Sequence, residues 1–231
     1  IMGYLIREKK GRNAIFLAGS FMFLVNIVLQ YAVSVAFFHF NFIEELLVII
    51  RESMDQSFSM LKSMGQAEGT TKIKEQFENG IKLIETLMPS LFLMSSFIIV
   101  FFIQLVSIPI IKRFGVKVDG WARVRDISLP KSFLWYYLVT LLATLLLQPE
   151  EGTYWYWALT NLSYILQLFM VFQGLTFIFH FCDKKGLPKA LPIMAVILSF
   201  LIPFFLYIVK ILGIIDLGFD LRNRPERKVK K

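Results

Sequence analysis

Polar side chains inside otherwise apolar stretches are the residues of this sequence best suited to chemistry. Gln173, Thr176 and His180 lie in the uncharged stretch 154–182. At about 100° per helical residue they fall within about 60° of one another. An amide, a hydroxyl and an imidazole can each donate and accept hydrogen bonds, so this stripe is a candidate lining for a polar substrate. The alternative is hydrogen bonding between helices, worth about 0.6 kcal/mol per contact in a membrane. The remaining candidate substrate-lining residues are Asn161 and Gln104.

A second group of polar residues closes the last apolar stretch of the chain. It comprises Lys210, Gly213, Asp216, Gly218, Asp220 and Arg222. A carboxylate at the end of an apolar helix is costly unless a basic group pairs with it. We therefore expect Asp216 or Asp220 to pair with a basic residue of the loop 112–131 or of the C-terminal tail. The group is interpreted either as a helix end held by salt bridges or as a docking motif for a cytoplasmic partner.

Neither a catalytic centre nor a metal or cofactor site is predicted. The two histidines, His39 and His180, stand far apart in the sequence, and Cys182 is the only cysteine. None of the metal-binding, phosphate-binding or nucleophile motifs with defined spacing occurs. The sequence therefore favours a binding or structural protein over an enzyme.

Long apolar stretches must position these polar residues. Four of them, 14–38, 90–111, 132–147 and 154–182, contain no charged residue, and 56% of the chain is hydrophobic. About 20 apolar residues in a helix cross the hydrocarbon core of a bilayer. The stretches lack the alternation of barrel strands, so the predicted fold is an all-α, polytopic transmembrane helix bundle. The whole chain, 1–231, is expected to form one transmembrane domain in contact with the lipid bilayer.

The last apolar block, 190–219, is long for one span and contains Pro203. Proline removes a backbone donor and interrupts a helix. We interpret the block as a tight hairpin of two short spans, 188–202 and 204–219, which gives about six spans in total. The alternative is a single kinked helix.

Basic residues divide unevenly between the two sides of these spans. They are concentrated in 1–13, 112–131, 183–189 and 222–231, whereas 39–89 holds eight acidic and five basic residues. Under the positive-inside rule the basic segments are cytoplasmic, the C-terminus included, and 39–89 is external. The expected location is the cell membrane. The formal net charge of +8 does not indicate nucleic-acid binding, because the basic residues cluster at the ends of apolar stretches.

The external segment 39–89 has helical periodicity in two parts, separated by the polar stretch 65–71. We expect an amphipathic helical hairpin that caps the bundle, gates it, meets a partner or lies on the membrane surface. Pro89 is expected at the start of the second span, a position at which helices tolerate proline.

Several segments resemble the YybS-like family of bacterial membrane proteins. The most distinctive is the closing ILGIIDLGFDLRNR of 211–224, and FQGLTFIFHF, ISLPKSF and REKKGRNA are similar as well. That family has no established activity, and its members usually begin with further hydrophobic helices, so N-terminal spans are expected before residue 1. The family is distantly similar to the substrate-binding membrane subunits of energy-coupling-factor transporters, which bind vitamins or metals within a six-helix bundle.

Two functions remain open on this basis. The first is a transport-related bundle that binds a small molecule and has no ATPase of its own. The second is a membrane scaffold or regulatory subunit that docks a membrane or cytoplasmic protein through the external hairpin or the tail. An aqueous cavity that reaches Asn161 and Gln173 would favour the first function. A dry bundle with an exposed apolar hairpin face would favour the second.

Overall fold

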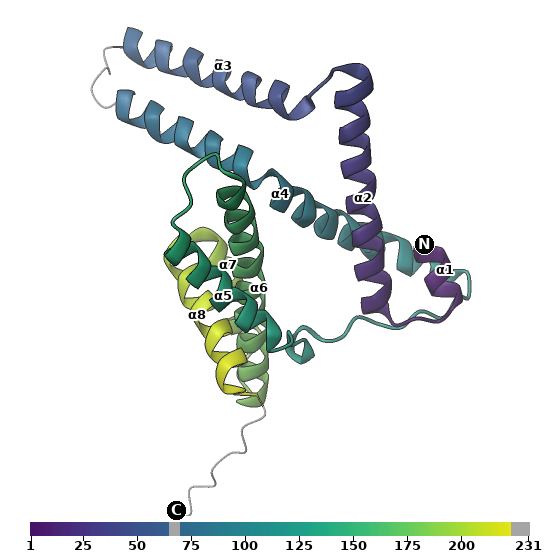
Figure 1. Ribbon diagram of the computed structural model, residues 1–231. Helices are drawn as coiled ribbons and strands as arrows, with labels where there is room; N and C mark the ends of the chain where they lie inside the picture. The colour runs from purple at the N-terminus through teal and green to yellow at the C-terminus, as the bar shows by residue number, and fades with distance from the viewer. Residues whose placement is uncertain (65–69, 223–231) are drawn as a thin grey trace, which may run out of the picture. The chain divides into compact units, whose positions relative to one another are not determined.

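The computed structural model describes residues 1–64 and 70–222, and every regular element within these ranges is a helix (Figure 1). This confirms the all-α prediction. The chain divides into two compact units, 1–120 and 121–231, which are described one at a time. The prediction of a single domain stays a prediction.

The first unit contains α1 (Met2–Arg7), α2 (Arg12–Phe38), α3 (Phe42–Ser63) and α4 (Thr70–Arg113). Helix α4 packs across α2, and the Phe16 and Phe97 rings meet with centroids 5.7 Å apart. Side chains at four-residue intervals on α4, namely Val100, Gln104 and Ile108, are buried. This spacing gives α4 one inward face, as expected for a helix that packs along a single stripe.

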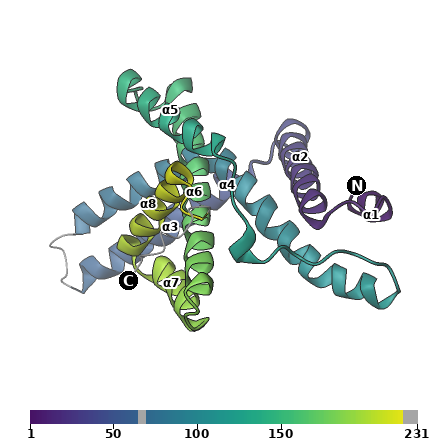
Figure 2. The same cartoon turned by 90° about the horizontal axis from the view of Figure 1, so that it is seen from below.

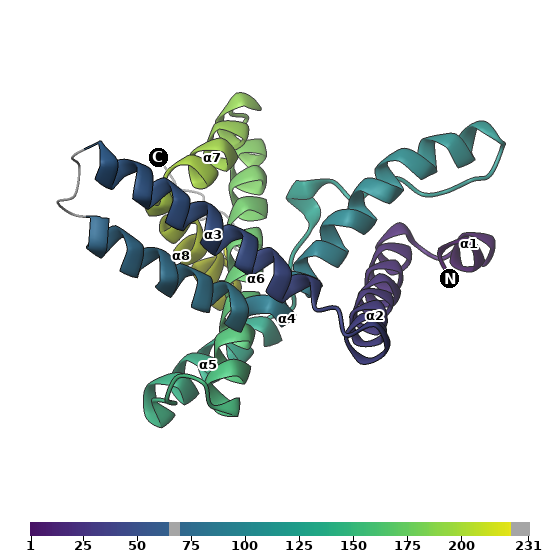
Figure 3. The ribbon, with the colours of Figure 1, turned by 90° about the horizontal axis from the view of Figure 1, so that it is seen from above.

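A structured corner joins α2 to α3. Phe40 donates its amide to the Ser34 carbonyl at 3.2 Å, and the Ser34 hydroxyl returns a bond to the Phe40 carbonyl at 2.8 Å. Asn41 accepts from the Glu44 amide at 3.3 Å and from the Tyr31 hydroxyl at 3.2 Å, so it caps α3 and ties it to α2. Only residues 39–41 separate the two helices. Helix α3 leaves to the side of α2 and does not fold back along it (Figures 1 and 3).

The predicted hairpin of 39–89 is formed by α3 and the first part of α4, which run side by side (Figures 1 and 3). Arg51 pairs with Glu85 at 2.9 Å and with Glu78 at 3.5 Å, and the Glu85 hydrogen bond raises the pKa of Arg51. Lys74 pairs with Asp55 at 2.6 Å. The predicted break at 65–71 lies mostly outside the described residues.

Pro89 does not start a helix, which corrects the sequence-based expectation. It lies inside α4, which continues unbroken from Thr70 to Arg113. A proline within a helix removes one backbone hydrogen bond and bends the axis without ending the helix. Helix α4 changes direction in its middle part (Figures 2 and 3), which contains Pro89. The part of α4 in the hairpin and its apolar part therefore belong to one helix, whose axis changes direction between them.

The second unit contains η1 (Val124–Asp126), α5 (Ser132–Leu147), α6 (Tyr154–Lys184), α7 (Ala190–Leu201) and α8 (Pro203–Phe219). Its apolar core lies where α5, α6 and α8 meet. Tyr137, Leu166, Met170 and Leu217 are buried there, and Leu129, Phe133, Leu134 and Ile214 pack around them.

Helices α6 and α8 are parallel neighbours. Lys210 bonds to Gln167, Asp216 to Gln173 and Arg222 to Thr176, so the contacts advance in the same order along both helices. Helix α7 must therefore run in the opposite direction between them. The block 190–219 is thus a hairpin broken at Pro203, as predicted. Proline opens α8, where its missing N–H has no cost because the first turn lacks partners anyway.

Three helices in the described ranges are long and apolar enough to cross a membrane: α2, the part of α4 from Lys72 onward, and α6. Helices α5 and α7 are apolar but shorter, with 16 and 12 residues. At 1.5 Å per residue, α7 is only about 18 Å long, so it falls well short of the roughly 30 Å hydrocarbon core.

Candidate functional site: a polar cluster and pocket at the ends of α6 and α8

Backbone contact between α6 and α8 brings the polar residues together. A Cβ added at Gly174 would lie 1.9 Å from the Val209 carbonyl oxygen, and one added at Gly213 would lie 2.0 Å from the Met170 carbonyl oxygen. Only glycine permits this approach at both positions. Small residues at a crossing let membrane helices pack closely. The crossing fixes the facing positions on either side of it, including Gln173 and Asp216.

Gln173 connects α6 to α8 and to the segment that precedes α5. Its side-chain nitrogen donates to Asp216 Oδ2 at 2.6 Å and to the Ser128 hydroxyl at 3.3 Å. Its side-chain oxygen accepts from the Leu129 amide at 2.8 Å. The side chain is almost fully buried. Gln173 therefore uses both ends of its amide to hold three segments together.

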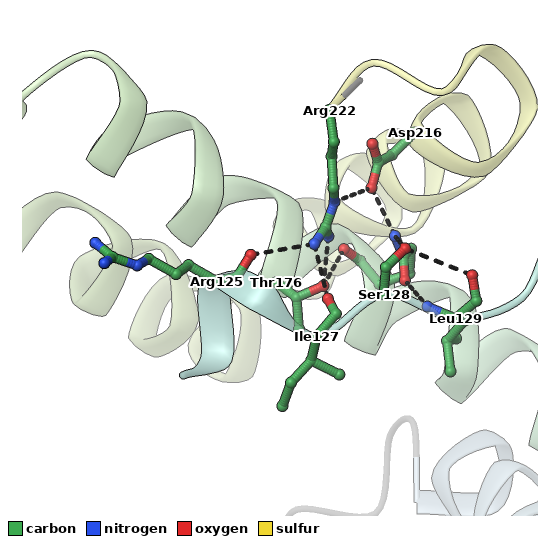
Figure 4. Close-up of polar contacts among 8 residues, drawn as sticks. Arg125, Ile127, Ser128, Leu129, Thr176, Asp216 and Arg222 are labelled. Atoms are coloured by element: carbon green, nitrogen blue, oxygen red, sulfur yellow. Dashed lines mark hydrogen bonds and ion pairs between the residues drawn. The ribbon is translucent and has the colours of Figure 1, made fainter. Parts of the chain in front are cut away.

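Arg222 stands beside this amide and makes four hydrogen bonds (Figure 4). It donates to Asp216 Oδ2 at 2.8 Å and to the Thr176 hydroxyl at 2.7 Å. It also donates to the backbone carbonyls of Ile127 and Arg125, at 2.7 and 3.2 Å. The planar guanidinium can serve several acceptors at once, which an ammonium group cannot do in the same geometry. The predicted pairing of Asp216 with a basic residue is present, and we call Gln173, Thr176, Asp216 and Arg222 the polar cluster.

Asp216 is not fully satisfied by these partners. Oδ2 accepts from both Gln173 and Arg222, whereas Oδ1 is buried and has no hydrogen-bond partner among the described residues. A buried carboxylate oxygen without a partner is costly. The cluster therefore retains unused accepting capacity.

A pocket of about 480 Å³ adjoins the polar cluster. It is lined by Arg125, Asp126, Ser128, Leu129, Pro130, Lys131, His180, Asp216, Leu217, Asp220 and Arg222. The lining contains both cationic and anionic side chains. Lys131 pairs with Asp220 at 3.1 Å, and Arg125 pairs with Asp183 and lies 3.8 Å from Asp126. The lining suits a small molecule that carries both charge signs or several hydroxyl groups.

The structure distributes the predicted substrate-lining residues differently. Gln173 and Thr176 face inward as predicted, and half-buried His180 lines the pocket. Asn161 is buried higher on α6 and donates to the Trp157 carbonyl at 2.9 Å, within its own helix. Gln104 is buried in α4 of the first unit, where neither end of its amide has a partner among the described residues. Asn161 and Gln173 do not line the pocket.

The residues of the closing motif also separate into different roles. Lys210 lies outside the polar cluster, where it bonds to Gln167 at 3.1 Å and sits 4.8 Å from the Tyr207 ring centre. An added Cβ at Gly218 would make an ordinary 3.5 Å contact with Leu134. Asp220 ends α8 in the left-handed conformation, with φ of 50°, a position that aspartate tolerates better than most residues. Gly213, and not Gly218, is therefore the glycine that close packing requires.

Sequence reasoning did not identify the acceptors and donors of the segment 125–129. The carbonyls of Arg125 and Ile127, the Leu129 amide and the Ser128 hydroxyl all contact the polar cluster. Three of these groups belong to the backbone, and a backbone group leaves no residue-specific signal. The available signal was the ISLPKSF segment, whose proline marks the turn into α5.

Comparisons with known proteins agree with a membrane location. A sequence family described as a predicted membrane protein family, DUF2232, matches residues 1–217. The chain is 31% identical over 223 residues to the uncharacterized protein YybS of Bacillus subtilis (strain 168). That alignment covers 96% of this chain and 72% of the relative. No solved structure matches.

Proposed function

Because the chain belongs to the DUF2232 family of predicted membrane proteins, its polar pocket has to be understood within a bilayer, and we propose that it binds a small polar molecule there. In this proposal the protein crosses the cell membrane several times, with about six spans. It binds its ligand without an ATPase or a catalytic step of its own. A binding component of a transport system fits this description.

The pocket beside the polar cluster is the observation that supports this proposal. Its lining combines the cations Arg125, Lys131 and Arg222 with the carboxylates Asp126, Asp216 and Asp220. Ligand sites commonly place a few polar groups at fixed positions in a concave surface. The polar cluster supplies such fixed positions, because its side chains are held by several hydrogen bonds each.

The distribution of basic residues supports a cytoplasmic position for the pocket. Its cationic lining comes from the basic segments 112–131 and 222–231, which the positive-inside rule assigns to the cytoplasm. The ligand would then enter from the cytoplasm or from the inner leaflet of the membrane.

A scaffold or regulatory subunit is the second candidate function. It is favoured by the hydrogen bonds of Gln173 and Thr176, which serve internal contacts, and by the exposed apolar side chains of α3. A partner would then be bound through the external hairpin or the cytoplasmic tail, and the pocket would be filled by that partner.

Native purification distinguishes the two functions. The protein is extracted from its own membranes into nanodiscs, and small molecules and proteins that remain bound are identified by mass spectrometry. If the pocket binds a small molecule, the wild type should retain that molecule and His180→Ala should lose it. His180→Ala alters the pocket lining without removing a hydrogen bond of the polar cluster. Lys184→Ala, at the end of the same helix, is the matched control and should retain it. Retention of a protein alone, unaffected by His180→Ala, would favour the scaffold.

A further inference from the structure

We propose that the hairpin of α3 and the first part of α4 is a membrane-surface element, whose exposed apolar face lies in the lipid surface on the side of the membrane where α2 ends. The proposal concerns residues 42–63 and 72–88 alone and is independent of what the pocket binds.

Ion pairs occupy one edge of this hairpin. Arg51 contacts Glu78 and Glu85, and Lys74 contacts Asp55, so the pairs join corresponding sides of the two antiparallel helices. The buried side chains Leu47, Phe58 and Ile81 lie between the helices. Because these pairs join α3 to α4, the opposite edge of α3 faces away from α4.

That opposite edge is apolar and exposed. On α3 the side chains of Leu46, Ile49 and Met60 stand about 140° or more around the helix from Arg51, at about 100° per residue. They are 54%, 58% and 66% exposed. Ile73 and Ile84 of α4 are exposed as well, about 80–140° around that helix from Lys74, Glu78 and Glu85. Ser53 and Gln56 are the polar residues within the α3 stripe, Ser57 lies at its border, and no charged residue falls in the stripe.

The remaining sector of α3 carries the charges. Glu45, Glu52 and Asp55 are exposed there, and Glu45 borders the apolar stripe, about 40° around the helix from Ile49. A helix with one charged and one apolar exposed side is typical of segments that lie in the membrane interface. Such an arrangement places the apolar side among the acyl chains and the charged side in water.

Continuity with α2 identifies lipid as the occupant. Helix α2 is long and apolar enough to cross the bilayer, and its last residues, Phe37 and Phe38, are exposed to the extent of 78% and 74%. Only residues 39–41 separate it from α3, and the hydrogen-bonded corner at Ser34 and Asn41 fixes the change of direction. Helix α3 therefore begins where α2 leaves the hydrocarbon and runs to the side of it (Figure 3).

Spin labels test the proposal in the full chain. Single cysteines replace Ile49, Met60 or Glu52 in a Cys182→Ala background, and each variant is labelled and reconstituted in vesicles of phosphatidylethanolamine and phosphatidylglycerol. Collision rates are measured with oxygen, which concentrates in lipid, and with a water-soluble nickel chelate. The proposal predicts an oxygen-to-nickel ratio severalfold higher at 49 and 60 than at 52, which is the matched control on the charged side.

Two outcomes would overturn the proposal. Equal ratios at the three positions would place the apolar face in water. Protection of 49 and 60 from both reagents would show that protein covers the face, from a second copy or from another partner. Because these exposed positions tolerate a label without loss of buried contacts, and two stripe positions are compared, a local defect at one of them does not decide the result.

Discussion

Gly174 and Gly213 meet backbone to backbone at the crossing of α6 and α8, where a Cβ on Gly213 would lie 2.8 Å from the Gly174 amide nitrogen. The polar cluster begins at Gln173, the residue just before Gly174 on α6, and at Asp216, three residues after Gly213 on α8. The close approach of α6 and α8 at the two glycines therefore also brings Gln173 and Asp216 within hydrogen-bonding distance.

Gly213→Ala should separate α6 from α8. The new methyl group would lie 2.0 Å from the Met170 carbonyl oxygen, so the backbones of the two helices must move apart. Overpacking of this kind costs about 1–3 kcal/mol. Thermal unfolding in nanodiscs measures the effect. Gly218→Ala is the control, because its methyl group has an ordinary contact; an equal loss of stability in both variants would contradict the account of the crossing.

Gln173→Ala should destabilise the segment before α5 as well as the helix pair. It removes the acceptor of the Leu129 amide and a donor to Asp216, and buried groups left without partners cost about 1–3 kcal/mol. Ser199→Ala should cost less, because the Ala195 carbonyl to which its buried hydroxyl donates lies within the same helix. Faster hydrogen exchange at Leu129 in Gln173→Ala, but not in Ser199→Ala, is the expected signature.

Asp216→Asn should be far more damaging than Asp220→Asn. Removal of one charge from a buried pair leaves Arg222 uncompensated, at a cost of about 3–5 kcal/mol. The Asp220 side chain is 41% exposed in its pair with Lys131, and exposed pairs contribute about 0–1 kcal/mol. Chemical unfolding of both variants gives the comparison. Similar values would mean that the closing motif holds only solvated charges.

Labelling with a membrane-impermeant thiol reagent measures the membrane topology. Cysteines at positions 68 and 228, each in a Cys182→Ala background, should differ: position 68 should react from outside the cell and position 228 should not. The reason is the basic excess of the tail and the acidic excess of the external hairpin. Reaction of both from outside would contradict the hairpin arrangement of 190–219 across the membrane.

The sequence correctly predicted the helices and breaks that depend on local composition. It did not predict features that depend on contacts with other parts of the chain. The stretch 132–147 coincides with α5, and Pro203 marked the break between α7 and α8, because composition and proline act within the chain segment itself. The prediction that Pro89 begins a helix was wrong, because a proline can bend a helix or begin one and the sequence does not distinguish these outcomes.

The candidate site was predicted in part for the same reason. The cost of a buried charge required a partner for Asp216, and Arg222 was among the basic residues considered. The inward direction of Gln173 and Thr176 followed from helical spacing. The segment 125–129 could not be found in advance, because its contribution consists mostly of backbone groups that any residue type would supply.

The contact between Arg222 and the Arg125 carbonyl joins positions 97 residues apart. The segment before α5 leaves the ribosome early, yet the guanidinium that donates to its carbonyls arrives only after α8 has been made. The second unit therefore cannot complete these contacts until Arg222 has been added. A ribosome-bound chain halted inside α8 should expose residues 125–129 to protease, and a chain extended well past Arg222 should protect them.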